Sequence, residues 1–224
     1  MAIQKHMNFF ELQKASAKPG CPLCRIIADR ADKYIDSTLF EHISDRPFRA
    51  HYRAAGGFCS FHARSLVSFR DGLAVAILSR DVLEDRITAF DKMRPWKPGG
   101  RCPVCMESEK FEDEYLEFFC GATGNSDEER ELREFFTSSE GLCANHYDSL
   151  LFTRKGRRRN VPAWIRTFQE AKFKELKARL DTFIKFSSYD KDKEFAALSE
   201  KDQLVWKEAA ACLNRNIVGG VSRE

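Results

Sequence analysis

Cys21-Pro22-Leu23-Cys24 and Gly57-Phe58-Cys59-Ser60-Phe61-His62 are the two stretches of this sequence that decide its fold. Both return later in the chain, as Cys102-Pro103-Val104-Cys105 and as Gly141-Leu142-Cys143-Ala144-Asn145-His146. The two offsets, from Cys21 to Cys102 and from Cys59 to Cys143, differ by only three residues. Such similar offsets indicate an internal duplication, in which each repeat carries three cysteines and one histidine in the same order.

These residue types at these spacings favour metal binding. A Cys-x-x-Cys turn places two thiolates close enough to bind one cation, and its proline restricts the backbone. In a Cys-x-x-His stretch that starts a helix, both side chains lie on one helix face, and the helix N-terminus stabilises the thiolate. Taking each repeat as one unit, we predict two tetrahedral Cys3His sites. The predicted ligands are Cys21, Cys24, Cys59 and His62 in the first repeat and Cys102, Cys105, Cys143 and His146 in the second.

Zinc is the expected metal, with two ions per chain, because four soft or borderline ligands without an open position are typical of structural zinc. The same closed ligand set argues against metal-dependent hydrolysis, which needs a metal-bound water. An iron–sulfur cluster with one histidine ligand is an alternative that the spacing does not exclude. A disulfide framework is disfavoured, since three cysteines per repeat leave an odd thiol each time.

The composition is that of a globular, mainly helical protein. Of the 224 residues, 43% are hydrophobic and 32% are charged, and the 19 phenylalanines predict a Phe-rich core. The 12 glycines and 7 prolines are few for an all-β fold with many tight turns. We therefore expect a mainly α fold with two pseudo-repeated helical Cys3His metal-binding units and a C-terminal helical segment. The expected boundaries are 1–96, 97–160 and 161–224, with the C-terminal segment packing on both units in one compact body.

Apolar residues recur at helical spacing through most of the chain. We expect one helix after Cys24 that ends near Asp45-Arg46-Pro47, because proline disfavours helix at the residue before it. A second, long helix is expected from residue 59 to residue 90, followed by a Pro/Gly-rich linker over 95–100. The remaining expected features are an exposed loop or weak helix start over 121–131, a helix over 164–186, a capping box at 199–202 and a last helix that stops at Gly219-Gly220.

Taken together, the motifs resemble an uncharacterised bacterial family known only as a domain of unknown function. The likeness rests on Cys21-Pro-Leu-Cys24, on Tyr34-Ile-Asp-Ser-Thr-Leu-Phe-Glu-His-Ile-Ser-Asp45 with Arg49, and on Gly57-Phe-Cys-Ser-Phe-His-Ala63. It also includes Cys-Pro-Val-Cys105, Gly-Leu-Cys-Ala-Asn-His146, Lys185-Phe-Ser-Ser-Tyr189 and Trp206. The order of cysteine and histidine is its specific part. The resemblance implies metal-binding positions and no particular reaction.

Cysteines and histidines also occur outside the repeat. Cys120 and Cys212 are expected to be small buried side chains, and a resolving-thiol role for Cys120 is the alternative. His42 and His51 are expected to make helix-end hydrogen bonds or to face solvent. No nucleophile is spaced to complete a catalytic set with either of them.

A basic run follows the second metal motif. It is the best candidate in the sequence for contacts with nucleic acid or another phosphate-bearing anion. A solvated loop between helices is the simpler interpretation, because a net charge of +3 is mild for a nucleic-acid-binding protein. The run consists of Arg154, Lys155, Arg157, Arg158 and Arg159.

The sequence contains no Gly-rich phosphate loop, no Ser/His/Asp order and no HExxH helix. We therefore expect a metal-binding interaction or regulatory protein that is not an enzyme and that binds another protein, with nucleic acid as a second candidate partner. The alternatives are a thiol redox or electron-transfer protein with an iron–sulfur cluster, and an enzyme whose pocket the sequence does not reveal. No targeting segment or membrane-length apolar stretch is visible, so we expect a cytoplasmic protein without a membrane partner.

Overall fold

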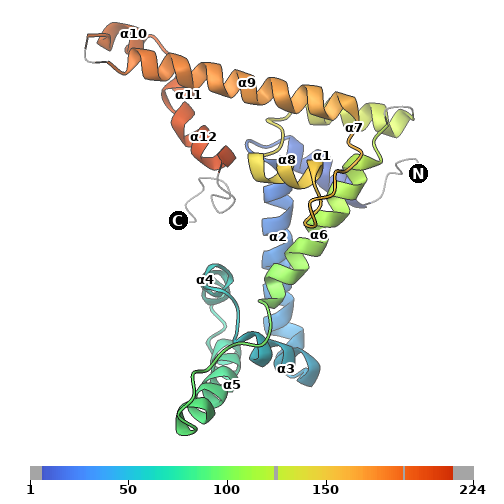
Figure 1. Ribbon diagram of the computed structural model, residues 1–224, viewed down its shortest axis with the longest axis vertical. Helices are drawn as coiled ribbons and strands as arrows, with labels where there is room; N and C mark the ends of the chain where they lie inside the picture. Colours follow the sequence, from blue (N-terminus) through green and yellow to red (C-terminus); the bar gives the residue numbers. More distant parts are fainter. Residues whose placement is uncertain (1–6, 124–125, 189, 214–224) are drawn as a thin grey trace. The chain divides into compact units, whose positions relative to one another are not determined.

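The computed structural model describes residues 7–123, 126–188 and 190–213 of the chain (Figure 1). Over these ranges the protein is mainly α, as predicted, with twelve α-helices, one π-helical segment and no strand. The first elements are α1 (Met7–Ser16), α2 (Pro22–Ser37), η1 (Thr38–His42), α3 (Arg46–Ala55), α4 (Ser60–Ser68), α5 (Gly72–Asp91) and α6 (Pro103–Cys120). The others are α7 (Asp127–Thr137), α8 (Ala144–Leu151), α9 (Ala163–Phe186), α10 (Asp192–Ala196), α11 (Glu200–Gln203) and α12 (Val205–Leu213).

Some predicted features fall outside this description. Tyr189 and the helix stop at Gly219-Gly220 lie outside the described residues. Within the described ranges, no helix is both long and apolar enough to cross a membrane.

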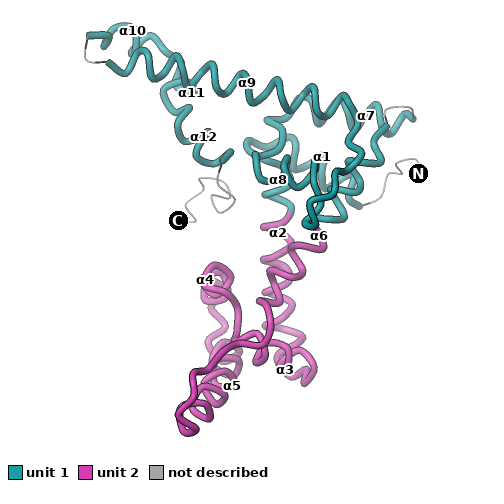
Figure 2. The backbone as a smooth tube through the Cα atoms, viewed as in Figure 1, with its two compact units in different colours: residues 1–26, 113–224 teal, residues 27–112 magenta. Residues whose placement is uncertain are grey.

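The chain forms two compact units, and one of them is inserted into the other in sequence order (Figure 2). Unit 1 consists of Met1–Ile26 and Asp113–Glu224, and unit 2 consists of Ile27–Glu112. Helices α2 and α6 each begin in one unit and end in the other. Because these helices continue through the unit boundary, the units do not follow the consecutive segments 1–96, 97–160 and 161–224 expected from the motifs.

Unit 2 packs the second part of α2, η1, α3, α4, α5 and the first part of α6 around one hydrophobic core. Two arginine–aspartate pairs tie α3 to α5. Arg49 makes two hydrogen bonds of 2.7 Å to Asp81, whose side chain is only 3% exposed, and Arg53 binds Asp85 in the same way one turn further along. The Arg49 guanidinium holds the pKa of Asp81 below its ordinary value. The buried core residues are Ala31, Ile35, Leu39, Tyr52, Phe58, Leu66, Ala74, Leu78, Val82 and Val104.

Unit 1 has an aromatic core, in agreement with the high phenylalanine content. The fully buried Phe136 of α7 lies 4.9 Å from the ring centroid of Phe119 and 5.5 Å from that of Phe168. Phe9 of α1 packs edge to face on Phe135, which explains why α1 lies along α7. These contacts join helices from the beginning, the middle and the last third of the chain into one body.

The first helical run ends near the expected Asp45-Arg46-Pro47, since η1 stops at His42 and Asp45 has an extended backbone. The prediction missed the helix that follows, because Pro47 occupies the first turn of α3, where a proline needs no amide hydrogen bond. The long helix expected over 59–90 is broken into α4 and α5 at Arg70, which has a left-handed φ of 59°, and Asp71 then caps α5 by accepting a hydrogen bond from the Ala74 amide.

Two other helix starts follow from side-chain caps. Ser126 and Glu129 form a capping box that begins α7, so a helix starts within the polar stretch 121–131. Ser199 accepts a hydrogen bond from the Asp202 amide, as the predicted capping box requires, and begins the short α11. Helix α12 then continues to Leu213.

Candidate metal centres

All eight predicted ligands meet in two groups of four. Site 1 is formed by Cys21, Cys24, Cys143 and His146, and site 2 by Cys59, His62, Cys102 and Cys105. In each group the four ligand atoms lie within 4.8 Å of one another, so each group could hold one metal ion. Site 1 belongs entirely to unit 1 and site 2 entirely to unit 2.

The grouping of the ligands differs from the prediction, which took each repeat as one site. Each site instead combines the Cys-Pro-x-Cys turn of one repeat with the Cys-x-x-His turn of the other. The outer pair of motifs forms site 1 and the inner pair forms site 2, so the two sites are nested along the chain.

Helix lengths explain the nesting. The part of α2 that follows Cys24 carries the chain about 20 Å away from this ligand, at roughly 1.5 Å per residue. The 10 residues of α3 correspond to only about 15 Å, so the chain reaches Cys59 while it is still in unit 2. The 18-residue α6, about 27 Å long, brings it back to unit 1 before Cys143.

Each of the four motifs starts a helix. Cys21 and Cys102 stand directly before a proline in the first helical position, and their carbonyls accept hydrogen bonds from the amides of Arg25 and Met106. Cys59 and Cys143 are the N-caps of α4 and α8. Two helix N-termini therefore point toward each site. They favour the net charge of about −1 that three thiolates and one divalent ion leave.

The donor distances fit a single tetrahedral ion. Zinc–sulfur bonds of ~2.3 Å and zinc–nitrogen bonds of ~2.0 Å at tetrahedral angles place two sulfurs about 3.8 Å apart, and a sulfur about 3.5 Å from the nitrogen. In site 1 the sulfurs of Cys24 and Cys143 are 3.6 Å apart. Nδ1 of His146 lies 3.4, 3.3 and 3.2 Å from the sulfurs of Cys21, Cys24 and Cys143.

Site 2 has the same geometry. The sulfurs of Cys59 and Cys105 are 3.7 Å apart. Nδ1 of His62 lies 3.3, 3.6 and 3.4 Å from the sulfurs of Cys59, Cys102 and Cys105. Both histidines therefore direct the same ring nitrogen at the three sulfurs, and both are buried.

The thiols of site 1 shift one another's pKa in opposite directions. Hydrogen bonds from Cys21 and Cys24 hold the pKa of Cys143 well below its ordinary value, whereas the hydrogen bond to Cys143 raises the pKa of Cys24. Burial lowers the pKa of His146, but hydrogen bonds with Cys143 and Cys21 outweigh burial and raise it to about 10. Three thiolates side by side would repel one another, and a bound cation would offset that repulsion.

The thiols of site 2 divide in a similar way. Burial opposes ionisation of Cys59, but the backbone amide of His62 and the thiol of Cys105 bring its pKa below the ordinary value. Burial and the charge of Cys102 raise the pKa of Cys105 to about 12. The amide contribution at Cys59 is the expected effect of a helix N-terminus on a cysteine.

A buried glutamine supports the Cys-x-x-His turn of site 1. The side chain of Gln169, on α9, accepts a 2.7 Å hydrogen bond from the Leu142 amide and donates a 2.8 Å bond to the Leu142 carbonyl. A Cβ on Gly141 would lie 2.8 Å from Oε1 of this glutamine, and Gly141 has a left-handed φ of +78°. Glycine is therefore required at this point, two residues before the ligand Cys143.

Tyr52 of α3 takes the equivalent place in site 2. Burial raises the pKa of Tyr52, and a backbone hydrogen bond from Phe58 opposes that rise. A Cβ on Gly57, whose φ is +90°, would lie 3.2 Å from the Tyr52 hydroxyl. No motif marks Gln169 or Tyr52 in the sequence. For Gln169 the available signal is a polar residue four positions after Ile165 on the buried face of α9.

The basic run lies in a short hairpin after α8. An isolated antiparallel bridge joins Phe152 to Arg158, and Arg159 returns a backbone hydrogen bond to Leu151. Arg154 and Arg159 both pair with Asp113 of α6. The structure thus divides the predicted run into two residues held by a carboxylate and three exposed ones. The exposed residues are Lys155, Arg157 and Arg158.

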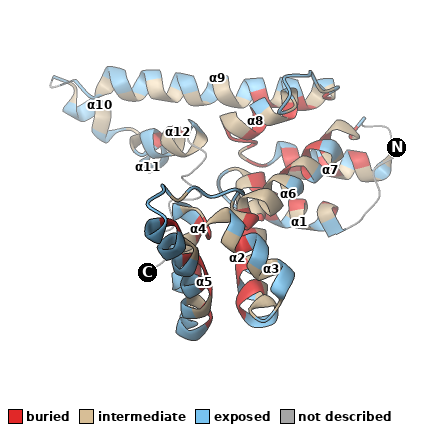
Figure 3. Ribbon diagram, turned by 60° about the horizontal axis from the view of Figure 1, so that its bottom comes forward, coloured by how far each residue is buried: buried red, intermediate tan, exposed pale blue. Residues whose placement is uncertain are grey.

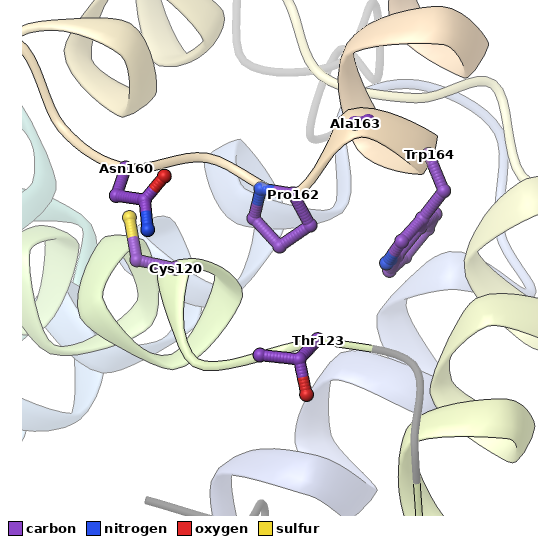
Figure 4. Close-up of a pocket in the computed structure, with 6 residues that line it drawn as sticks. All are labelled: Cys120, Thr123, Asn160, Pro162, Ala163 and Trp164. Atoms are coloured by element: carbon purple, nitrogen blue, oxygen red, sulfur yellow. The ribbon is translucent and has the colours of Figure 1, made fainter.

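The remaining predicted residues are not part of either site. Cys120 is half-buried at one end of an open pocket of about 370 Å³, beside Asn160, with Trp164 at the other end (Figure 4). Burial raises the pKa of Cys120, and no second cysteine lines this pocket. Cys212 is also half-buried, and its sulfur accepts a hydrogen bond from the Ala144 amide.

His42 and His51 lie in unit 2 at separate places. His42 stands 4.0 Å from Asp45, at the end of η1, with its side chain 45% exposed. This is the helix-end position expected for it. His51 is exposed on α3. Neither is a member of a Cys/His group within the described residues.

Comparison with known proteins confirms the resemblance to an uncharacterised family. Residues 10–98 match the family described as "Family of unknown function (DUF6062)", a segment that holds both motifs of the first repeat. The chain is also 29% identical over 136 residues to an "Uncharacterized 23.9 kDa protein in xynA 3'region" from Caldicellulosiruptor sp. (strain Rt8B.4). The aligned part covers 58% of this chain and 65% of that protein. No solved structure matches the chain.

Proposed function

We propose that the protein is a zinc-stabilised interaction protein, in which two structural zinc ions hold the binding surfaces of two helical units in place. The observation that carries this proposal is the donor geometry, in which three sulfurs and one Nδ1 lie within 4.8 Å of one another in both sites. These are the distances around one tetrahedral ion with no coordination position left for water or substrate.

The same distances favour zinc over the iron–sulfur alternative. A cluster places several iron and sulfide atoms between its protein ligands, so those ligands must stand further apart than around one ion. Because all four ligand atoms of each site lie within 4.8 Å of one another, each group suits one ion better than a cluster, which holds the ligands of its different irons further apart. Among single ions, zinc suits a closed Cys3His set. It has no redox chemistry, and its filled d shell imposes no geometry other than the tetrahedral one that four such ligands favour.

A stabilising role agrees with the positions of the two ligand groups. Each ion would join two helix N-termini that lie far apart in sequence, and such sites contribute their binding free energy to folding. The partner is proposed to be a protein.

Metal analysis of anaerobically purified protein tests this function. We expect colourless protein with about two zinc ions per chain, and chelator-treated protein with a lower melting temperature. Brown protein that contains iron and acid-labile sulfide would overturn the zinc assignment. Cys120→Ser is the matched control, because it removes a thiol outside both sites and should leave the zinc content unchanged.

A further inference from the structure

Helix α5 is apolar on two opposite faces, and only one of them is covered. One face contributes Ala74, Leu78, Asp81, Val82 and Ala89 to the buried interior of unit 2. The other face is open (Figure 3). Leu73 is 74% exposed, Leu83 54%, Ile87 55% and Phe90 60%.

These exposed residues follow a heptad. Spacings of three and four residues alternate along the outer face of α5, which is the a/d pattern of a coiled-coil seam. We call this set the outer seam. Arg80 is its only charged member, and the residues that α5 buries in its own unit fall at the other heptad positions. The outer seam consists of Leu73, Ala76, Arg80, Leu83, Ile87 and Phe90.

We propose that the outer seam binds a second copy of this chain, with the two α5 helices antiparallel about a two-fold axis. In an antiparallel pair, a positions of one helix pack against d positions of the other. Leu73 then meets Phe90 of the second copy, Ala76 meets Ile87, and Arg80 meets Leu83. One register satisfies all six positions, as the self-complementary interface of a two-fold dimer requires.

The charges select this alignment over the alternative. A parallel pair would place Arg80 against Arg80 of the second copy, so that like charges would face each other in the seam. In the antiparallel pair each Arg80 meets a leucine. Arg80 already lies 3.7 Å from Glu84 on its own helix, so its charge stays paired when the seam is covered.

The size of the seam predicts a weak dimer. Helix α5 has 20 residues and is about 30 Å long, and a contact one helix wide is smaller than the ~800 Å² per partner of a standard stable interface. The dimer should therefore form in a concentration-dependent manner. This inference goes beyond the proposed function, and it does not depend on which metal the sites bind.

Sedimentation equilibrium of the full-length, metal-loaded protein, from low to high micromolar concentration, tests the proposal. We expect a monomer–dimer equilibrium. Leu83→Glu and Ile87→Glu should each weaken it by at least about tenfold, because they place a carboxylate in the apolar seam. Phe40→Glu is the matched control, since Phe40 is 87% exposed in the same unit but lies on η1 rather than α5, and it should leave the equilibrium unchanged.

A charge exchange checks the role of the Arg80–Glu84 pair in the seam. Arg80→Glu should weaken the dimer, because two carboxylates then stand one turn apart beside the seam, and adding Glu84→Arg should restore it. Protein that stays monomeric at all concentrations would overturn the proposal, and so would a dimer that Leu83→Glu and Ile87→Glu leave intact. Either result would leave the zinc measurements unaffected, so failure of the dimer and failure of the proposed function are distinguishable.

Discussion

Each ligand-bearing Cys-x-x-His turn is held by a buried side chain from a helix that carries no metal ligand. Gln169 binds both backbone groups of Leu142, directly before Cys143. Tyr52 accepts a hydrogen bond from the backbone of Phe58, directly before Cys59. These two side chains fix the position of a ligand without touching the metal, and such supporting groups are known to tune metal affinity.

Gln169→Leu should therefore weaken metal binding at site 1 alone. The change leaves the amide and carbonyl of Leu142 buried without partners, at about 1–3 kcal/mol for an unsatisfied group, and we expect a loss of roughly 10–100-fold in affinity. Chelator competition, carried out in protein whose site 2 is disabled by Cys59→Ala, measures this directly.

The matched variant is Tyr52→Phe, which removes the hydroxyl beside Phe58. It should weaken site 2 and leave site 1 unchanged, as measured in protein whose site 1 is disabled by Cys143→Ala. If Gln169→Leu leaves site 1 at full affinity, the two hydrogen bonds between Gln169 and Leu142 do not position the ligand turn.

At the scale of elements, the contact between α3 and α5 depends on two ion pairs of different burial. The side chains of Arg49 and Asp81 are 29% and 3% exposed, whereas those of Arg53 and Asp85 are 37% and 35% exposed. Removing one partner of a buried pair leaves an unpaired charge in the interior, and exposed pairs contribute little.

Arg49→Met should consequently lower the free energy of unfolding at least about twice as much as Arg53→Met does, because it removes both hydrogen bonds to the buried Asp81 carboxylate and leaves only Arg80, 3.8 Å away, beside it. Arg53→Met should cost less than about 1 kcal/mol. Urea unfolding of the metal-loaded variants measures both. The double variant Arg49→Met/Asp81→Leu should recover part of the loss, and equal costs for the two arginines would contradict this account.

The hairpin after α8 gives a second prediction at this scale. If nucleic acid binds here, Ala substitution of Lys155, Arg157 and Arg158 together should abolish a salt-dependent mobility shift, because these three residues are exposed whereas Arg154 and Arg159 pair with Asp113. The control replaces three exposed lysines of α9, and it removes the same charge. The control lysines are Lys174, Lys177 and Lys185.

Two outcomes would remove the nucleic-acid partner from consideration. One is the absence of any shift at low salt. The other is an equal loss in the hairpin variant and the α9 control, which would indicate an effect of net charge without a specific surface.

Among the elements, the helix ends are the features that local sequence rules predicted least well. Helical spacing predicts most helices, since the periodicity reports which face of a helix is buried. It predicted one helix over 59–90 because it does not register the left-handed residue at Arg70. Pro47 fits both the end and the first turn of a helix, so the residues after it decide, and α3 was missed for that reason.

At the scale of the whole molecule, the eight ligands were predictable and their grouping was not. The spacing from Cys24 to Cys59 is nearly that from Cys105 to Cys143, so spacing is consistent with consecutive as well as nested sites. The lengths of α2 and α6 decide between them, because these helices carry the chain from one unit into the other and back. Gln169 and Tyr52 had no sequence motif, since their role depends on tertiary contact.

Because the sites are nested, a metal bound at either one would link distant parts of the chain. In unit 1, which is formed from two separate segments, site 1 joins Cys21 and Cys24 of the first to Cys143 and His146 of the second. A cross-link over so long a loop restricts the unfolded chain strongly. The two repeats therefore depend on each other, and neither contains a complete site.

Zinc stoichiometry of two double variants tests this nested arrangement most directly. Cys24→Ala/Cys143→Ala removes two ligands of site 1, and Cys24→Ala/Cys59→Ala removes one ligand from each site. After dialysis against a weak chelator, we predict about one zinc ion per chain in the first variant and almost none in the second. The reverse result, with almost no zinc in the first variant and one ion retained in the second, would show that each repeat forms its own site and would contradict the account.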